Sequence, residues 1–274
     1  MESLAERSLV VQGSALASGA LVPLETDLVE LPNGGAFVLR RLLSAKPKHL
    51  RPAGPKPNPF LPCDPRLEVC SIHEHVVLLN KYPVQPGHLL LITKVWEPQT
   101  GWLKAIDFQA LLDIWNAQPG LWFFNSGPDA GASQPHRHLQ LLPRTENEQR
   151  CPMDGTYLKL LAGENPTQPW QQRLGCRGLS GISAIQSSEL YDLYLELAHD
   201  LGLGRPETEV KPLIPYNLLI SDGWMVMVPR GREAHAGFSI NGLGFAGYLL
   251  ATSDSDLAWL ERHGPGQLLD AVSA

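Results

Sequence analysis

The sequence predicts an α+β domain built on a mostly antiparallel sheet that is flanked by helices. Apolar, β-branched runs of strand length recur with turn residues between them, and separate segments have amphipathic helical spacing. Gly and Pro are abundant, with 25 and 24 among 274 residues, which favours loops and short strands over long helices. We found no internal repeat and no sharp linker, so we expect one domain over residues 1–274.

Each expected element follows from a local pattern. Residues 1–20 have helical composition, and residues 27–43 predict two short strands around an Asn33-Gly34-Gly35 turn. Residues 144–169 are polar and are expected to form a loop. Further strands are predicted at 68–72, 76–79, 88–93, 121–124, 136–142, 216–220 and 224–228, and helices at 108–116, 188–201 and 254–262.

The charge balance argues against a nucleic-acid partner or an anionic membrane. The chain has 28 acidic and 22 basic residues, a net charge of -6. One segment departs from this balance, because no Asp or Glu lies between Leu31 and Cys63 while six basic residues do. Seven prolines within 44–65 prevent regular structure there. This segment, at about 44–65, is either a solvated basic loop or a flap that binds a polyanion.

The cysteines and the N-terminus favour a cytoplasmic protein. The four cysteines are few and irregularly spaced, as expected in a reducing compartment: Cys63, Cys70, Cys151 and Cys176. The N-terminus lacks a basic region, and its uncharged stretch over residues 8–24 is interrupted by Gly, Ser and Gln. We therefore expect neither a signal peptide nor a membrane span.

The segment HRHLQLL, residues 136–142, carries the clearest chemical pattern. Side chains alternate along a strand, so His136, His138 and Gln140 should share one face. At neutral pH one imidazole nitrogen can act as a nucleophile when the other donates to a fixed acceptor, and His138 is the best placed. Gln140 offers an amide donor to a phosphoryl oxygen without acting as a base. The alternative is a set of histidines with a structural role only.

The loop before this strand is rich in small residues. Gly, Ala and Ser over residues 126–133 allow backbone amides to approach an anion closely. Asn125 and Gln134 add side-chain amides at its ends. By itself such a loop usually serves only as a turn, but its position directly before the histidine strand favours a sugar and phosphate site.

The longer segment NSGPDAGASQPHRHLQLLP, residues 125–143, resembles the diadenosine tetraphosphate phosphorylases (ATP adenylyltransferases) of the histidine triad superfamily. The resemblance implies a histidine-triad-like fold. Shorter segments resemble the same family in the same order: AKPK (45–48), NPF (58–60), LNKYPV (79–84), PYNLL (215–219), WMVMVPR (224–230) and NGLGFAG (241–247).

This resemblance implies a two-step, reversible adenylyl transfer. His138 would attack the α-phosphorus of diadenosine 5',5'''-tetraphosphate, expel ATP and become adenylylated. Inorganic phosphate would then attack this intermediate and release ADP. Gln140 would contact the phosphoryl group, and His136 would have a supporting role. A glutamine where triad hydrolases have a third histidine favours transfer to phosphate over transfer to water.

The resemblance also implies the residues that bind substrate. A bound tetraphosphate carries about four negative charges, so the acid-free segment independently supports Lys46. For Lys81 the alternative to phosphate binding is a lysine at a strand end that is simply exposed to solvent. The implied set is Lys46, Asn80 and Lys81 for the phosphates, Asn125 for the ribose or α-phosphate, Gly131, Ala132, Ser133 and Gln134 for the polyphosphate, and Asn241 for another part of the nucleotide.

No dedicated metal site and no organic cofactor are expected. Related uridylyltransferases bind zinc through a close Cys pair with histidines, whereas Cys63 and Cys70 are seven residues apart, with His73, His75 and His136 as the histidines in question. A divalent cation, Mg²⁺, is expected to arrive on the polyphosphate. Expected partners are a dinucleoside polyphosphate, ATP, ADP and inorganic phosphate. The alternatives are a hexose-1-phosphate nucleotidylyltransferase and a non-catalytic nucleotide sensor.

Overall fold

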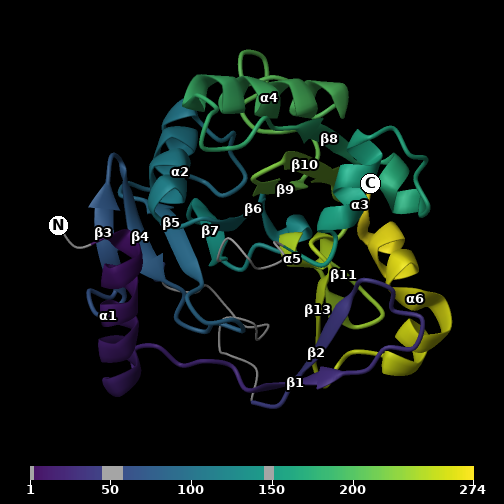
Figure 1. Ribbon diagram of the computed structural model, residues 1–274, viewed down its shortest axis with the longest axis horizontal. Coiled ribbons are helices and arrows are strands. Elements are labelled where there is room, and N and C mark those ends of the chain that lie inside the picture. The colour runs from purple at the N-terminus through teal and green to yellow at the C-terminus, as the bar shows by residue number, and fades with distance from the viewer. Residues whose placement is uncertain (1–2, 45–57, 145–150) are drawn as a thin grey trace.

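Every neighbouring pair of strands in the central eight-stranded sheet is antiparallel, as the sequence predicted. The computed structural model describes residues 3–44, 58–144 and 151–274. Across the sheet (Figure 1) the order is β3 (Glu68–Ile72), β4 (His75–Leu79), β5 (Leu89–Thr93), β7 (His138–Pro143), β6 (Gly120–Asn125), β9 (Tyr216–Ser221), β10 (Trp224–Pro229) and β8 (Gly175–Gly178).

Two smaller sheets complete the strand content of the described ranges. In the first, β1 (Thr26–Val29) pairs antiparallel with β2 (Val38–Leu42), and β13 (Tyr248–Ala251) pairs parallel with β2. The second is the ribbon of β11 (Ala234–His235) and β12 (Phe238–Ser239). The pairing of β13 with β2 brings the last part of the chain against the first.

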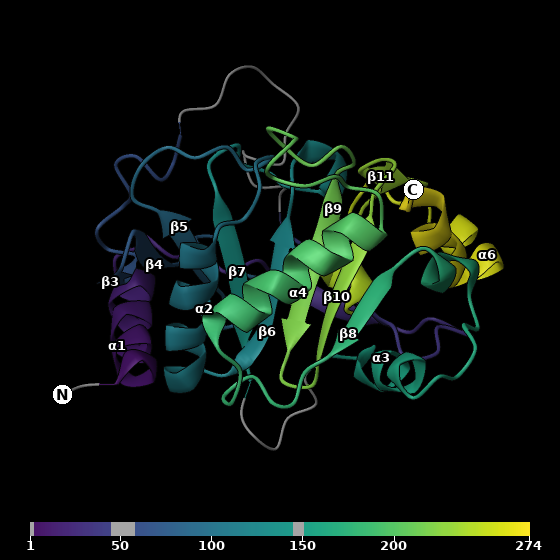
Figure 2. The ribbon, with the colours of Figure 1, turned by 90° about the horizontal axis from the view of Figure 1, so that it is seen from above.

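Three helices cover one face of the central sheet, as Figure 2 shows: α1 (Leu4–Ala17), α2 (Ala105–Ala117) and α4 (Ser187–Asp200). A capping box starts α1, because Ser3 accepts from the Glu6 amide and the Glu6 carboxylate accepts in return. Helix α4 buries Leu190, Tyr194 and Leu197, which helical spacing places on one side. These helices bury the face of the sheet opposite to the one that carries His138.

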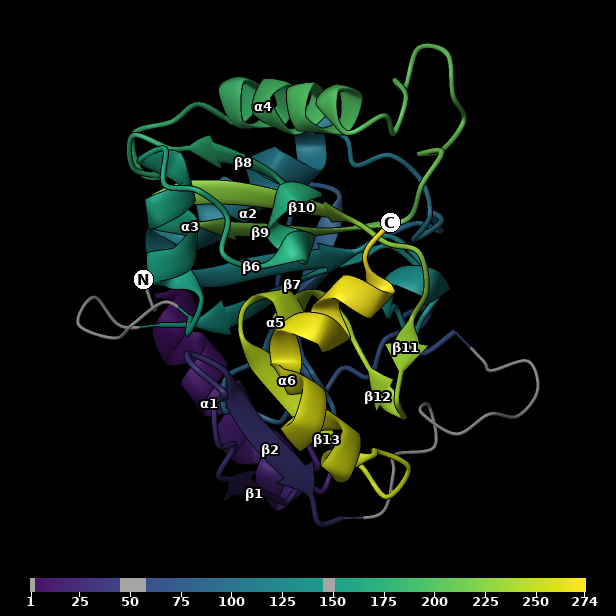
Figure 3. The same ribbon diagram turned by 90° about the vertical axis from the view of Figure 1, so that its right-hand side faces the viewer.

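The opposite face carries two separate apolar clusters. One packs α3 (Asp154–Leu161), α5 (Gly242–Phe245), α6 (Leu257–Val272) and the three-stranded sheet against β6, β9 and β10 (Figure 3). The other packs Phe60 over β4 and β5. Between them β7 presents His138 and Gln140, which pair directly with Ile92 and Leu90 of β5. A polar stretch therefore lies between the two clusters.

Several local expectations need correction. Residues 144–169 were expected to form a loop, yet they contain α3, whose eight residues are too short for a clear helical period and whose Tyr157 packs on Trp224 of β10. The predicted strand 136–142 begins at His138, since His136 forms only an isolated bridge with Pro98. Strands β8 and β13 were not expected. Helix α6 extends to Val272 across a kink at Gly264 and Pro265.

Most of the predicted basic flap, residues 45–57, lies outside the described residues. Within the described ranges, none of the helices has both the length and the apolar character that a membrane span requires. Among the described residues, short 3₁₀ turns also occur at Pro128–Ala130 and Pro169–Gln172.

Candidate active site

His138 presents one free ring nitrogen. Its Nδ1 lies 2.8 Å from the backbone carbonyl oxygen of His136. A carbonyl can only accept, so Nδ1 carries the proton and the lone pair is on Nε2. Nε2 forms no hydrogen bond with any described residue. This tautomer is the one that a nucleophilic imidazole requires.

The surroundings of His138 keep its imidazole neutral. The residue is 4% exposed, and burial lowers its pKa to about 4. The Phe60 ring lies 5.4 Å from the His138 ring and 5.6 Å from that of His136, so both imidazoles meet the same phenyl group. At neutral pH the Nε2 lone pair is therefore available.

His136 is held at both of its ring nitrogens. The Asn58 carboxamide oxygen accepts from the Phe60 amide at 3.0 Å, so the Asn58 nitrogen donates to Nδ1 of His136, also at 3.0 Å. Nε2 then carries the proton and donates to Thr93, whose carbonyl and hydroxyl oxygens both lie 2.9 Å away. Burial also lowers the pKa of His136. This fixed ring supports the backbone carbonyl that orients His138.

Gln140 has a partner that the sequence did not single out. Nε2 of His88 lies 3.1 Å from Oε1 of Gln140, and the His88 ring packs 5.8 Å from that of Phe123. His88 begins the predicted strand 88–93, and alternation would have placed it with Leu90 and Ile92. The missing information was the pairing of β5 with β7, which no local pattern shows.

Gln99 is a second residue that sequence reasoning missed. Its side chain is 1% exposed and joins the ends of β6 and β7. Its oxygen accepts from the His138 amide at 2.8 Å, and its nitrogen donates to the carbonyls of Asn125 at 2.7 Å and His138 at 3.2 Å. Gln99 therefore brings Asn125 and His138 together. Its neighbours Pro98 and Thr100 form no recognisable motif with it, so the sequence gives no signal for its role.

The Asn125 carboxamide is oriented by two donors. Its Oδ1 accepts from Asn217 Nδ2 at 2.8 Å and from the Gly242 amide at 2.9 Å. The Asn217 oxygen in turn accepts from buried Arg230 at 2.5 Å. The Asn125 Nδ2 group, which forms no hydrogen bond with a described residue, is left to donate beside His138.

The loop over residues 126–135 is closed by its own backbone. The amides of Gly131 and Ala132 donate to Pro128 and Gly127 at 2.8 and 2.9 Å. Gly131, at φ 85°, abuts Asn241, because an added Cβ would lie 2.7 Å from the Asn241 Cβ. The amides of Asp129, Ser133 and Gln134 form no hydrogen bond with described residues, so they are backbone donors that this loop can offer to an anion.

The remaining predicted binding residues lie in different settings. Asn80 uses one amide hydrogen on Nδ1 of His88, at 3.1 Å. Lys81 is exposed, with its ammonium 5.8 Å from the Tyr82 ring centre. Asn241 caps α5 by accepting from the Leu243 amide at 2.9 Å. Lys46 lies outside the described residues.

Three of the side chains that raised the question of zinc, His73, His75 and Cys63, have other partners. His73 and His75 pair with Asp113 and Asp107 of α2 at 2.6 and 2.7 Å. Cys63 Sγ lies 3.9 Å from a Glu68 carboxylate oxygen. Within residues 3–44, 58–144 and 151–274, no group of three or more His, Cys, Asp or Glu side chains is arranged to hold a metal ion.

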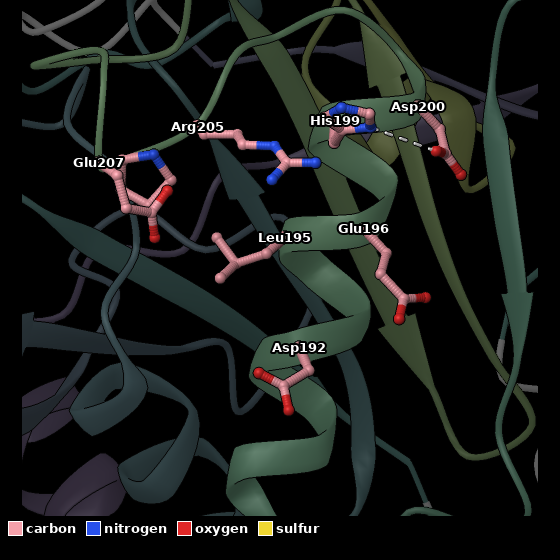
Figure 4. A pocket seen from close by; sticks show the side chains of 8 residues that line it. Asp192, Leu195, Glu196, His199, Asp200, Arg205 and Glu207 are labelled. Carbon is pink, nitrogen blue, oxygen red and sulfur yellow. Dashed lines mark ion pairs between the residues drawn. The ribbon is translucent and has the colours of Figure 1, made fainter.

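A hollow of about 420 Å³ lies along α4 (Figure 4). Because α4 covers the other face of the sheet, this hollow is separate from the histidine strand. Its carboxylates repel a polyphosphate. The lining residues are Asp192, Leu195, Glu196, His199, Asp200, Arg205, Pro206 and Glu207.

The fold and the histidine strand together define a histidine triad nucleotidyltransferase, and comparisons with known proteins identify the branch. The Ap4A phosphorylase N-terminal domain matches residues 1–158, and the ATP adenylyltransferase C-terminal domain matches residues 156–274. The chain belongs to the Ap4A phosphorylase family, which confirms the family predicted from the sequence motifs.

Two relatives from Saccharomyces cerevisiae are similar over most of this chain. Protein APA1 is 28% identical over 224 residues, covering 73% of this chain and 68% of the relative. Diadenosine 5',5'''-P1,P4-tetraphosphate phosphorylase 2 is 27% identical over 206 residues, covering 65% of this chain and 62% of the relative.

Solved structures confirm the fold. The structure of yeast Ap4A phosphorylase Apa2 in complex with Ap4A superimposes with a TM-score of 0.77 at 21% identity, covering 100% of this chain and 98% of that one. The complex of the same enzyme with AMP gives a TM-score of 0.76 at 20% identity, with coverage of 98% and 96%.

Proposed function

We propose that this protein cleaves diadenosine 5',5'''-tetraphosphate with inorganic phosphate to ATP and ADP, through a covalent adenylyl group on His138. The observation that carries the proposal is the 2.8 Å hydrogen bond from Nδ1 of His138 to the His136 carbonyl, which leaves Nε2 free. The family, and the yeast relative named as a diadenosine tetraphosphate phosphorylase, support this substrate.

In the first step Nε2 of His138 attacks the α-phosphorus. The N–P bond forms as the bond from this phosphorus to the bridging oxygen breaks, and the electron pair leaves with ATP. In this proposal the amide nitrogens of Gln140 and Asn125 donate to the phosphoryl oxygens as negative charge develops. One such donor is worth about 10²–10³ in rate in enzymes that stabilise an oxyanion.

In the second step a phosphate oxygen attacks the adenylyl group, the P–N bond breaks and ADP leaves. Inorganic phosphate is already an anion, so it needs no general base. Gln140 is a neutral amide and cannot accept a proton from water. This residue therefore favours phosphate over water as the acceptor, and the reverse reaction joins ATP to ADP.

We also propose that Mg²⁺ reaches the site on the polyphosphate. The hydrogen-bonded groups around His138 are imidazole rings, side-chain amides and a backbone carbonyl. Mg²⁺ prefers carboxylate, phosphate and water oxygens. Turnover should therefore saturate at the magnesium concentration that complexes the nucleotide. Saturation unrelated to nucleotide concentration would contradict this proposal.

A cytoplasmic location is likewise proposed. The four cysteines are free thiols, which suits a reducing compartment. Fractionation of cells that express a tagged full chain should place the protein with cytoplasmic markers. Enrichment in a membrane or secreted fraction would overturn this assignment.

Product analysis tests the reaction. Purified protein is incubated with diadenosine tetraphosphate and magnesium, with and without phosphate, and the nucleotides are separated by anion exchange. ATP plus ADP, formed only with phosphate, is expected. ATP plus AMP without phosphate would mean hydrolysis. An uncut but bound dinucleotide would mean a sensor, and turnover of uridine nucleotides would mean a hexose-1-phosphate nucleotidylyltransferase.

Trapping the intermediate tests the nucleophile. Without phosphate, the protein should gain one adenylyl group that survives denaturation in base and is lost in acid, as expected of a phosphoramidate. His138→Ala should abolish this mass increase and most turnover while retaining nucleotide binding. His199→Ala, at an exposed histidine of α4, is the matched control. Retained turnover in His138→Ala would end the assignment.

Lys46 and Lys81 are proposed to bind the phosphates. Lys46→Ala should raise KM with little change in kcat and should weaken the dependence of KM on salt. Lys159→Ala, in α3, removes a lysine outside the proposed site and controls for net charge. An unchanged KM in Lys46→Ala would remove this residue from the site.

A further inference from the structure

We propose that His88 is a positioning residue that fixes the Gln140 carboxamide with its nitrogen directed toward the reacting phosphoryl group. This inference rests on the proposed function. Both ring nitrogens of His88 are used in hydrogen bonds within the protein, one with Asn80 and one with Gln140. It acts through the 3.1 Å contact between its Nε2 and the oxygen of Gln140.

The orientation of the whole chain of groups follows from the backbone amide of Tyr82. This amide can only donate, so the Asn80 atom that lies 3.1 Å from it is the carboxamide oxygen. The other end of the Asn80 carboxamide is therefore its nitrogen. That nitrogen donates to Nδ1 of His88 at 3.1 Å.

The direction of the last bond follows from the first two. Because Nδ1 of His88 accepts, a neutral imidazole carries its proton on Nε2. Nε2 therefore donates, and the Gln140 atom that it meets is Oε1. The Gln140 NH₂ group is turned away from His88 and forms no hydrogen bond with a described residue. Two donors are thus left on the face that carries His138.

Burial keeps this arrangement intact. His88 is 7% exposed, and burial lowers its pKa to about 4, so it stays neutral at pH 7. An unrestrained glutamine amide can exchange its oxygen and nitrogen by rotation about its last bond. An oxygen directed at the phosphoryl group would repel the developing charge instead of stabilising it.

The same device occurs a second time at the site. Asn58 accepts from the amide two residues later and donates to Nδ1 of His136, as Asn80 does for His88. The imidazoles of His88, just before β5, and of His136, just before β7, are thus both held as the Nε2–H tautomer. One directs its proton to Thr93, and the other to Gln140.

Three substitutions at His88 distinguish the role of its Nε2–H donor from that of the size of its ring. His88→Phe keeps a ring of similar size without a donor. His88→Gln can place an N–H where Nε2 lies, whereas the shorter His88→Asn reaches only the position of Nδ1. Each is assayed for the single-turnover rate of His138 adenylylation, for KM and for folding by circular dichroism.

We expect His88→Phe to slow adenylylation about 10- to 100-fold with a change in KM below about threefold, since a misdirected donor acts mainly on the transition state. His88→Gln should restore most of the rate, and His88→Asn should not. If His88→Phe fails to fold, the comparison of Gln with Asn at this position still decides the matter. Equal rates in those two variants would overturn the inference.

A double-mutant cycle with Gln140→Ala gives the second test. If His88 acts through Gln140, His88→Phe should reduce the rate less than about threefold once Gln140 is alanine. Full multiplication of the two effects would overturn the inference. Wild-type protein that never becomes adenylylated would instead refute the proposed function, so the two failures are distinguishable.

Discussion

Asn217 donates its side-chain amide to Oδ1 of Asn125 at 2.8 Å, which links the start of β9 to the end of β6. The Asn217 oxygen accepts from Arg230, whose guanidinium is 1% exposed and also donates to backbone carbonyls such as that of Val272. Asn125 therefore receives its orientation from a buried chain of hydrogen bonds. Of the three residues linked by these hydrogen bonds, only Asn125 belonged to the site predicted from the sequence.

Removing Asn217 should affect both stability and catalysis. Asn217→Ala removes one hydrogen-bond partner from buried Arg230 and one from buried Asn125, so the free energy of unfolding should fall by about 1–3 kcal/mol. Adenylylation should also slow, because Asn125 Oδ1 then keeps only the Gly242 amide as a donor and the carboxamide is held less firmly. Urea unfolding and single-turnover assays measure the two effects. Asn116→Ala, at an exposed position of α2, should change neither; equal effects in both variants would contradict this account.

Comparing two glycines with the same φ distinguishes the cost of backbone strain from the cost of a steric clash when alanine is introduced. Gly131 and Gly163 both have φ 85°, but an added Cβ would lie 2.7 Å from Asn241 at Gly131 and meet nothing within 4 Å at Gly163. Gly131→Ala should therefore destabilise by about 1–3 kcal/mol more than Gly163→Ala. Thermal unfolding checks the difference. Equal losses would show that Gly131 does not pack as described.

The first half-reaction should tolerate acid. Burial lowers the pKa of His138 from 6.5 to about 4, so the nucleophile is protonated only near pH 4. Diadenosine tetraphosphate has no terminal phosphate that titrates near neutrality. The adenylylation rate, measured without phosphate, should stay level as pH falls through 6.5 and decline toward pH 4. A decline centred near 6.5 would show an exposed imidazole.

The same burial links stability to pH. Between pH 6.5 and about 4, the unfolded chain protonates His88 and His138 while the folded protein does not. Unfolding therefore takes up protons, and the free energy of unfolding falls as pH decreases, by about 1.4 kcal/mol per pH unit for each proton. Urea unfolding at pH 7 and pH 5 should show a smaller loss in His88→Phe than in wild type. An equal loss would contradict the buried neutral state.

Gln140→His tests how the site selects phosphate over water. An imidazole can accept a proton from water, which the amide cannot, so the variant should release AMP from the adenylylated protein in the absence of phosphate. Wild type should keep its adenylyl group over the same period. Anion-exchange analysis measures the AMP that each adenylylated protein releases without phosphate. An equal amount of AMP from the variant and from wild type would remove Gln140 from this role.

Local pattern was sufficient for much of the fold. Apolar runs of strand length predicted β3, β4, β5, β6, β9 and β10 to within a residue or two at each end. The reason is that most of these strands are buried at successive positions, so their burial is recorded as a continuous apolar run. It failed for α3, where a short helix is stabilised by the packing of Tyr157 on Trp224. It also failed for β13, whose partner β2 lies some two hundred residues earlier in the sequence.

The sequence by itself determined the class of fold, the family and the strand that carries His138. Each of these follows from patterns among residues that are close together in the sequence. The tertiary structure decided which groups surround it. His88 and Gln99 come from separate segments and meet Gln140 and His138 of β7 only through strand pairing and loop packing, and Asn217 of β9 meets Asn125 of β6 in the same way. The proton positions of His88 and His136 were decided the same way, because a tautomer depends on what each nitrogen meets and not on its neighbours in the chain.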